Sequence, residues 1–260
     1  EFRRVLFRSN AGYSVPGVVT GKPIVLGGSL GRTSATGDGV AISVREALKV
    51  KGINPQGASV AIQGFGKVGY WAALALEKLG LKVVAVSDVK GGVTGFSDVE
   101  TVARYVKEHG TVVGMPGTDA LTNTELLHLP VDVLVPAALA DSITHSSAPG
   151  IKAKVIVEGA NAPTTPQGDE IINDKGILVV PDILANSGGV IVSYFEWVQD
   201  KQNFFWSADE VRENLTQILM RSISEVSETA NSKKVTWREA ANMIGVGRVA
   251  QAHRLRGLYP

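Results

Sequence analysis

The chain contains no cysteine among its 260 residues. It therefore has no disulfide, no thiol nucleophile and no cysteine-ligated zinc site. Long apolar runs are also missing, because no stretch approaches the roughly 20 residues that a membrane-spanning helix needs. Neither sign of charge is in excess, since Lys and Arg number 26 and Asp and Glu number 25. These features predict a soluble globular protein that binds neither nucleic acid nor a membrane surface.

Histidine is scarce, and its distribution argues against a metal centre. The four histidines, His109, His128, His145 and His253, fall in four different segments, so we expect no metal site. Asp141 and Ser142 lie near His145 in the sequence, but no nucleophile-elbow motif accompanies them, so a hydrolase triad is not expected.

What the chain does contain is a glycine-rich turn between two short apolar strands. The first strand, at 60–62, enters a turn with Gly64, Gly66 and Gly69 at G-x-G-x-x-G spacing, and a helical pattern follows. The second strand ends on Asp88, and Gly64 and Asp88 are 88 − 64 = 24 positions apart. This is close to the roughly 20 positions that separate the glycines from the ribose-binding acid in dinucleotide-binding proteins.

Each part of this motif has a predicted role. Gly64 permits the tight turn, Gly66 lets a pyrophosphate approach the backbone, and Gly69 lets helix and strand pack closely. The free N–H groups at the start of the helix attract phosphate, and Asp88 accepts hydrogen bonds from a ribose. The combination of strand, glycines, helix, strand and acid predicts a dinucleotide site.

The rest of the chain alternates apolar strands with helical patterns. Further strands are expected at 131–135, 154–157 and 177–180, and helices at 34–51, 98–109, 163–173, from 184, 211–226 and 236–251. We expect 89–97 to be a turn-rich loop and 111–124 to be irregular. Continuous apolar strands indicate a sheet buried on both faces. The predicted fold is therefore a Rossmann-like, doubly wound α/β fold, with a mostly parallel sheet, flanking helices and a C-terminal helical segment.

Ligands of such sheets bind beyond the carboxyl ends of the strands. The segments expected there are 64–69, Asp88, 136–138, 158–161 and 181–187.

Four long motifs resemble those of the glutamate dehydrogenase family, part of the glutamate, leucine, phenylalanine and valine dehydrogenases. They read G-K-P-I-V-L-G-G-S-L-G-R-x-x-A-T-G-x-G-V, G-F-G-K-V-G, E-G-A-N-A-P-T-T-P and N-S-G-G-V-I-V-S-Y-F-E-W, and the resemblance covers about residues 12–260. The resemblance implies reversible oxidation of L-glutamate to 2-oxoglutarate and ammonia, through iminoglutarate, with hydride passing to NAD or NADP.

The resemblance also implies roles for individual residues. Ser193 is expected to bind the substrate's side-chain carboxylate, Val190 to pack beside the substrate, and Arg32 to organise the cleft. Thr36 and Asn186 are placed at the nicotinamide, and Ala137, Ala138 and Asn161 along the ribose and nicotinamide. The full set of expected cofactor-binding residues is Thr36, Gly64, Phe65, Gly66, Lys67, Val68, Gly69, Asp88, Ala137, Ala138, Asn161 and Asn186.

The family's catalytic lysine and aspartate belong to a substrate domain that precedes the G-V-V-T-G-K-P segment. No residue of this chain matches either, so we assign no catalytic residue here and expect this piece to be inactive alone. We expect 1–9 to be a cloning or assembly scar, 10–33 a linker from the substrate domain and 34–235 the NAD(P)-binding domain. The last segment, 236–260, is expected to be a helix that returns toward the substrate domain.

The choice between NAD and NADP is not decided by the motif. Asp88 favours NAD because a carboxylate repels the 2′-phosphate of NADP, whereas Lys90 and Ser87 could accommodate that phosphate. NAD is therefore the expected cofactor, with NADP or dual use as the alternative.

Two other functions stay open at this stage. One is a branched-chain or aromatic amino-acid dehydrogenase, although Ser193 and the G-G-S-L-G-R stretch favour glutamate over an apolar substrate. The other is a non-catalytic dinucleotide-binding module. The resemblance further implies a cytoplasmic enzyme whose full-length form is a homohexamer. An aromatic cluster at Trp197, Phe204, Phe205 and Trp206 is expected to be either core or interface.

Overall fold

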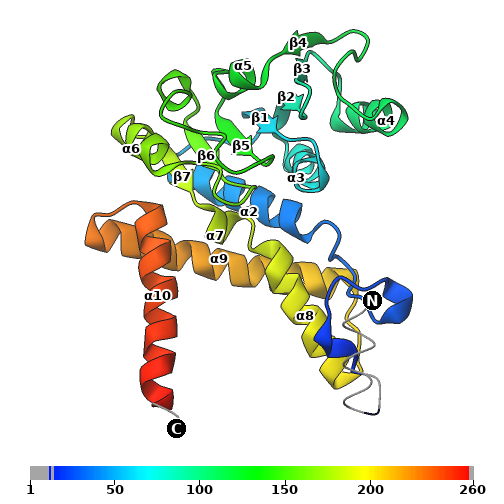
Figure 1. The fold of residues 1–260 in the computed structure, drawn as a ribbon, viewed down its shortest axis with the longest axis vertical. Helices are drawn as coiled ribbons and strands as arrows, with labels where there is room; N and C mark the ends of the chain where they lie inside the picture. The colour runs from blue at the N-terminus through cyan, green and yellow to red at the C-terminus, as the bar shows by residue number, and fades with distance from the viewer. Residues whose placement is uncertain (1–11, 13–14, 258–260) are drawn as a thin grey trace.

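The computed structural model describes residue 12 and residues 15–257, so the predicted scar at 1–9 lies outside the described residues. Its centre is a seven-stranded sheet with the order β4-β3-β2-β1-β5-β6-β7 (Figure 1). The strands are β1 (Ser59–Gln63), β2 (Lys82–Ser87), β3 (Gly92–Thr94), β4 (Asp119–Leu121), β5 (Val133–Pro136), β6 (Val155–Val157) and β7 (Leu178–Val180). All neighbouring pairs among β2, β1, β5, β6 and β7 are parallel, which confirms the predicted α/β fold.

Side chains from successive positions of the parallel strands enter two different cores. Ile62 and Val135 point into the larger core, and Ala61 and Leu134 point into the smaller core on the opposite face. Because both faces are covered, these strands have no solvent-facing side and read as continuous apolar runs.

Helices cover both faces of this sheet and extend beyond it. The helices are α2 (Ala35–Val50), α3 (Lys67–Lys78), α4 (Val99–His109), α5 (Asn123–Leu127), α6 (Pro166–Asp174), α7 (Asp182–Ala185), α8 (Gly188–Gln202), α9 (Ala208–Lys233) and α10 (Trp237–Arg256), with 3-10 turns η1 (Pro16–Val18), η2 (Ile24–Leu26) and η3 (Ala148–Gly150). Figure 1 shows α8, α9 and α10 on one side of the molecule, with α10 pointing away from the sheet.

Two predicted loops contain strands, so those predictions were wrong. The segment 89–97 includes β3, and 111–124 includes β4 and the start of α5. Both strands are three residues long and pair antiparallel at the sheet edge. Such short edge strands contain too few alternations of apolar and polar residues to be recognised by period.

Side-chain caps fix several helix starts. The Asp98 carboxylate accepts from the backbone N–H of Thr101, and Thr236 and Glu239 form a capping box. Two further capping boxes open α5 and α9, at Thr122 with Glu125 and at Ser207 with Glu210. The last helix reaches Arg256, five residues beyond the predicted end at Gln251.

Glycines let α2 lie closely between two other helices. A Cβ on Gly37 would lie 2.5 Å from the backbone nitrogen of Ala72 in α3, and one on Gly188 in α8 would lie 2.1 Å from the carbonyl oxygen of Ala35. Neither position tolerates a side chain without a backbone shift. The glycines therefore set the positions of α2 and α8, which contribute residues to the predicted site.

A buried ion cluster holds the segment before α2 against α8. The Nζ of Lys22 lies 2.6 Å from Glu196 Oε1 and 2.7 Å from Asp200 Oδ2, and all three side chains are almost fully buried. The backbone N–H of Gly21 also donates to Glu196 Oε2 over 2.8 Å. This cluster anchors the 15–33 segment, part of the predicted linker, on the helical side of the molecule.

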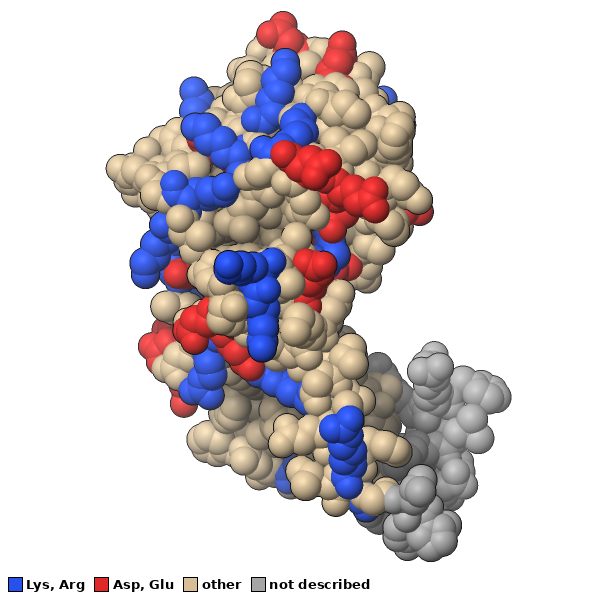
Figure 2. Space-filling view, turned by 90° about the vertical axis from the view of Figure 1, so that its left-hand side faces the viewer, with Lys and Arg blue, Asp and Glu red and all other residues tan. Residues whose placement is uncertain are grey.

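The surface combines charged and apolar groups. Figure 2 shows Lys and Arg together with Asp and Glu on the face it presents, and neither sign covers that face. Within residues 12 and 15–257, no helix has the length and hydropathy needed to cross a membrane. The predicted aromatic cluster is divided: Trp197, Phe204 and Phe205 are exposed, whereas Trp206 packs against Phe195 with ring centroids 5.3 Å apart.

Candidate functional site

A cleft of about 610 Å³ lies at the carboxyl ends of the central strands. Its walls come from the glycine turn after β1, from Asp88 after β2 and from residues 137–142 after β5. From β1 the chain continues to β2 on one side of it and later returns to β5 on the other side. Such a switch point in strand order is where open α/β sheets bind dinucleotides.

The three motif glycines have different surroundings. Gly64 has a φ of +98°, and a Cβ there would lie 2.7 Å from the backbone nitrogen of Ala138. A Cβ on Gly69 would lie 1.8 Å from the carbonyl oxygen of Gly64. At Gly66, by contrast, a Cβ would meet nothing within 4 Å, so the backbone there borders open space. The turn and packing roles predicted for Gly64 and Gly69 agree with this geometry, and the space beside Gly66 can admit a pyrophosphate.

The carboxylate of Asp88 is held in place by its own loop and by the segment that follows α4. Its Oδ2 accepts from Thr111 Oγ1 at 2.6 Å and from the N–H of Val112 at 2.7 Å, and its Oδ1 accepts from the N–H of Lys90 at 2.7 Å. Burial raises the pKa of this carboxyl, but the hydrogen bonds outweigh burial and lower the pKa below its ordinary value. Asp88 is thus a fixed anion at the edge of the cleft, with acceptor capacity left for a hydroxyl.

Ser87 does not border the cleft. Its side chain is fully buried, and its Oγ lies 3.3 Å from the backbone N–H of Gly64, which donates to it. The prediction that this hydroxyl could accommodate a 2′-phosphate is therefore wrong. Lys90, the cation in the same prediction, is exposed and lines the cleft.

The residues expected around the nicotinamide gather beyond β6 and at the α2–α8 contact. Asn186 Nδ2 donates to Asn161 Oδ1 over 2.7 Å, which joins the loop after β6 to the end of α7. Thr36 in α2 faces α8, because a Cβ on Gly189 would lie 2.5 Å from its Oγ1. Ala137 packs beside the same loop, since a Cβ on Gly159 would lie 3.1 Å from the Ala137 Cβ.

The residues expected to bind substrate also lie together. Arg32 Nε donates to Ser193 Oγ over 2.8 Å, and the Ser193 hydroxyl donates to the carbonyl oxygen of Gly189 over 3.0 Å. Val190 lies one turn away on α8 and is 67% exposed. The structure thus brings a cation, a hydroxyl and an apolar side chain to one part of the α8 surface.

Several residues that line the cleft were missed by the sequence analysis. On the side of Asp88 they are Val89, Val106, Gly110, Val112 and Asn123, and beyond β5 they are Leu139, Ala140, Asp141 and Ser142. The amide of Asn123 donates to the carbonyl oxygen of Asp88 over 3.0 Å. Most of these residues come from loops, where no periodic pattern marks them, whereas Val106 lies in α4.

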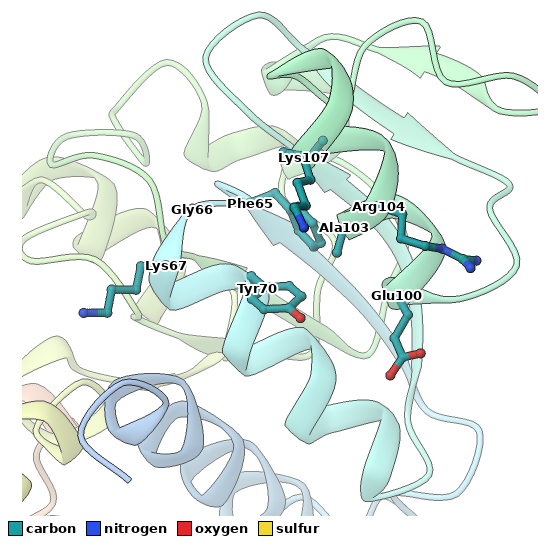
Figure 3. Close-up of a pocket in the computed structure, with 9 residues that line it drawn as sticks. Phe65, Gly66, Lys67, Tyr70, Glu100, Ala103, Arg104 and Lys107 are labelled. Atoms are coloured by element: carbon teal, nitrogen blue, oxygen red, sulfur yellow. The ribbon is translucent and has the colours of Figure 1, made fainter. Parts of the chain in front are cut away.

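A second hollow of about 660 Å³ lies on the other side of Phe65, between α3 and α4. Figure 3 shows Phe65 and Tyr70 at its floor, with Lys67 and Arg104 extending outward in opposite directions. Its Lys, Arg and Glu side chains are exposed, and it shares Phe65, Gly66 and Val106 with the cleft. Neither Asp88 nor the residues after β5 line it, so the cleft at the strand ends is the better candidate for a nucleotide. Among the described residues, no group of three or more His, Asp or Glu side chains is placed to hold a metal ion.

The strand order, the glycine turn and the terminal Asp88 define a Rossmann-like α/β protein. A profile of the family described as Glutamate/Leucine/Phenylalanine/Valine dehydrogenase matches residues 27–257. The chain belongs to this family.

Sequence relatives agree with this assignment. A glutamate dehydrogenase of Thermotoga maritima is 54% identical over 258 residues, which are 98% of this chain and 62% of that protein. A cryptic catabolic NAD-specific glutamate dehydrogenase of Bacillus subtilis is 47% identical over 94% of this chain and 58% of its own length. The chain thus spans about 60% of the length of the curated relatives that it matches.

Solved structures give the same result. The hetero-hexameric glutamate dehydrogenase of Thermus thermophilus, in a leucine-bound form, matches with a TM-score of 0.92 at 37% identity, over 99% of this chain and 61% of that one. The glutamate dehydrogenase of Peptoniphilus asaccharolyticus matches with a TM-score of 0.83, also at 37% identity, over 97% of this chain and 60% of that one.

Proposed function

We propose that this chain is the nucleotide-binding part of an NAD(P)-dependent glutamate dehydrogenase. The reaction is the reversible oxidation of L-glutamate to 2-oxoglutarate and ammonia. The bound nicotinamide supplies the acceptor for the hydride that leaves the substrate Cα, and water then hydrolyses the resulting iminoglutarate. The assignment rests on family membership, on the relatives' names and on the geometry around Ser193.

The observation that carries the choice of glutamate is the pairing of Arg32 with Ser193. Their 2.8 Å hydrogen bond places a guanidinium beside a hydroxyl on the surface where the substrate is expected. A carboxylate is bound well by such a pair, because the guanidinium has N–H groups besides Nε and the serine hydroxyl can turn from the Gly189 carbonyl to donate to it. An apolar amino-acid side chain would offer no acceptor to these donors, which disfavours leucine, valine and phenylalanine.

The residues present fit a dinucleotide in an extended pose across the cleft. The open space beside Gly66 and the start of α3 suit the pyrophosphate, and Asp88 suits the adenosine ribose. We propose that Ala137, Ala138, Asn161, Asn186 and Thr36 hold the nicotinamide half. Lys67 and Val68, in the first turn of α3, and Phe65 complete the set.

We propose NAD as the cofactor. Asp88 is ionised and fixed, and its negative charge would repel a 2′-phosphate bound beside it. Ser87 offers no compensating hydroxyl, because it is buried. Lys90 remains a nearby cation, so binding of NADP is weaker in this proposal rather than excluded.

We assign no catalytic residue to this chain and propose that proton transfer is supplied by another part of the full polypeptide. The relatives are longer than this chain, and the Thermus structure is hetero-hexameric. We propose that the exposed apolar side chains of α10, which include Met243, Val246 and Val249, contact that other part or a further subunit. A homohexamer is the expected assembly of the full enzyme.

The test joins this chain to the amino-terminal part of the Thermotoga maritima relative and follows NADH formation with four amino acids. The expected result is turnover with glutamate at a kcat/KM at least about 100-fold above that with leucine, valine or phenylalanine. A preference for an apolar amino acid would replace this proposal with the corresponding dehydrogenase. Dinucleotide binding without turnover of any of the four would favour a non-catalytic module.

A further inference from the structure

A fully buried carboxylate lies directly behind the loop that is expected to hold the nicotinamide. Glu158 follows β6 and has no exposed side-chain surface. Its Oε1 accepts from Thr164 Oγ1 at 2.6 Å and from Arg238 at 2.7 Å, and its Oε2 accepts from the N–H of Asp182 at 2.9 Å and from Arg238 at 2.9 Å. These four hydrogen bonds use the acceptor capacity of the carboxylate. Glu158 therefore has no acceptor site left for a ligand, and its hydrogen bonds instead hold the neighbouring segments in place.

The donors to Glu158 come from segments that shape the site. Asp182 begins α7, and its Oδ2 accepts from the N–H of Ala162 over 2.7 Å. Ala162 has a φ of +45°, a conformation that a non-glycine residue adopts only when its neighbours impose it. The loop that Ala162 closes contains Asn161, and Asn186, the residue that follows α7, donates to Asn161. The position of Glu158 thus determines the positions of both asparagines.

Arg238 supplies the positive charge that compensates the buried carboxylate of Glu158. It stands at the second position of α10, 80 residues from Glu158, and forms a two-point ion pair with it. Its other hydrogen bonds go to Asp169 of α6, from Nε at 3.1 Å and from a terminal nitrogen at 3.0 Å, and its Nη1 lies 4.0 Å from Asp182 Oδ1. Burial lowers the pKa of the guanidinium, but the hydrogen bonds and charges of Glu158 and Asp169 outweigh it, so the pKa is raised above its ordinary value.

We propose that Arg238 is a positioning residue for the nicotinamide half of the dinucleotide, acting through Glu158 on the Gly159–Ala162 loop and on α7. This inference rests on the proposed function. Without the guanidinium, Glu158 would be an uncompensated buried anion, which is costly enough to draw it toward water or to make it take up a proton. In either case the hydrogen bond that it accepts from Asp182 weakens, and the loop with Asn161 loses its fixed position.

The proposal separates the two halves of the ligand. Asp88 and the glycine turn belong to β1 and β2, whereas Glu158 and its loop follow β6, on the other side of the switch point. NADH spans both halves, whereas ADP lacks both the nicotinamide and its ribose and occupies only the first half and the pyrophosphate site. Loss of Arg238 should therefore weaken NADH binding and spare ADP, whereas a general loss of folding would weaken both.

The experiment measures the dissociation constants of NADH and ADP by calorimetric titration of the intact chain and three variants. Arg238→Gln removes the charge, and Arg238→Lys keeps it without the two-point geometry. Arg248→Gln is the matched control, since Arg248 lies on the same helix and pairs with Glu225 at the surface. The expected result is that Arg238→Gln weakens NADH by about tenfold or more, with ADP changed less than about twofold. Arg238→Lys should be intermediate, and Arg248→Gln should match the unmodified chain.

Two results would overturn the inference alone: unchanged NADH affinity in Arg238→Gln, or equal losses for NADH and ADP. Failure of the unmodified chain to bind either ligand would instead overturn the proposed cleft, and the inference with it. Should Arg238→Gln not fold, Thr164→Val removes one donor to the same carboxylate without unpairing a charge. It should weaken NADH by about threefold and again spare ADP, and equal effects on the two ligands would count against the proposal.

Discussion

Arg32 Nε and Ser193 Oγ lie 2.8 Å apart, although the residues are 161 positions apart in the sequence. The hydrogen bond joins the segment before α2 to the middle of α8. It also orients the serine hydroxyl, whose second contact is to the carbonyl oxygen of Gly189. The pair is the structural basis for the proposed preference for an acidic amino acid.

Ser193→Ala should raise the KM for glutamate without changing the KM for NAD. A hydrogen bond to a charged group contributes about 1.5–3 kcal/mol, so the KM should rise by at least about tenfold. The measurement uses the joined polypeptide described above, with Ser224→Ala on the exposed surface of α9 as the control. Equal KM values for glutamate in the Ser193 variant and the control would show that this hydroxyl does not bind substrate.

Lys22→Met should destabilise the protein strongly. It would leave Glu196 and Asp200 buried without their cation, and removal of one partner from a buried ion pair costs about 3–5 kcal/mol. Denaturant unfolding measures this change in free energy. Lys201→Met is the control, because Lys201 is exposed on α8 next to Asp200, and it should change the free energy of unfolding by less than about 0.5 kcal/mol. A similar small effect at Lys22 would mean that the cluster does not hold the 15–33 segment in place.

Gly69→Ala and Gly247→Ala should change stability in opposite directions. At Gly69 the new Cβ would meet the carbonyl oxygen of Gly64, so the variant should lose about 3 kcal/mol or fail to fold. Gly247 lies inside α10 with nothing within 4 Å of a new Cβ, so alanine there should stabilise by about 0.5–1 kcal/mol. Thermal unfolding of both variants checks this, and a tolerated alanine at Gly69 would contradict the described contact between strand and helix.

The contribution of Asp88 to stability should depend on pH below its ordinary pKa. Hydrogen bonds lower the pKa of this carboxyl in the folded state below the model-compound value of 3.8. Its stabilising effect is therefore fully present above pH 3.8 and is lost as the pH falls through the lower folded-state pKa. The difference in unfolding free energy between the unmodified chain and Asp88→Asn should be constant near neutrality and should shrink below pH 3.8. A difference that grows on acidification would reverse the assigned direction of the shift.

The sequence predicted those parts of the fold whose causes are local. The G-x-G-x-x-G turn and the five parallel strands depend on residues close together in the chain, so their patterns are readable. The short strands β3 and β4 were missed because three residues give no usable period, and their pairing is decided by the neighbouring strands.

Contacts between distant residues explain what could not be predicted at the site. Glu158 was recognised only as part of a motif, because its partner Arg238 lies in another helix and nothing in either local pattern points to the other. The sequence does not indicate that Ser87 is buried, and the structure shows that Gly92 and Gly64 pack closely against it. The ligand-binding roles of the site residues stay predictions, since they depend on cofactor and substrate groups that no pattern in the chain specifies.

The most direct test of the account is a fluorescence titration of NADH with the unmodified chain and with Gly66→Ala. A Cβ at this position would meet no protein atom within 4 Å, so folding and thermal stability should be unchanged. The same Cβ would occupy the space proposed for the pyrophosphate, so the affinity for NADH should fall by about tenfold or more. Equal NADH affinity in the two proteins, with both folded, would contradict the claim that the dinucleotide lies across this turn.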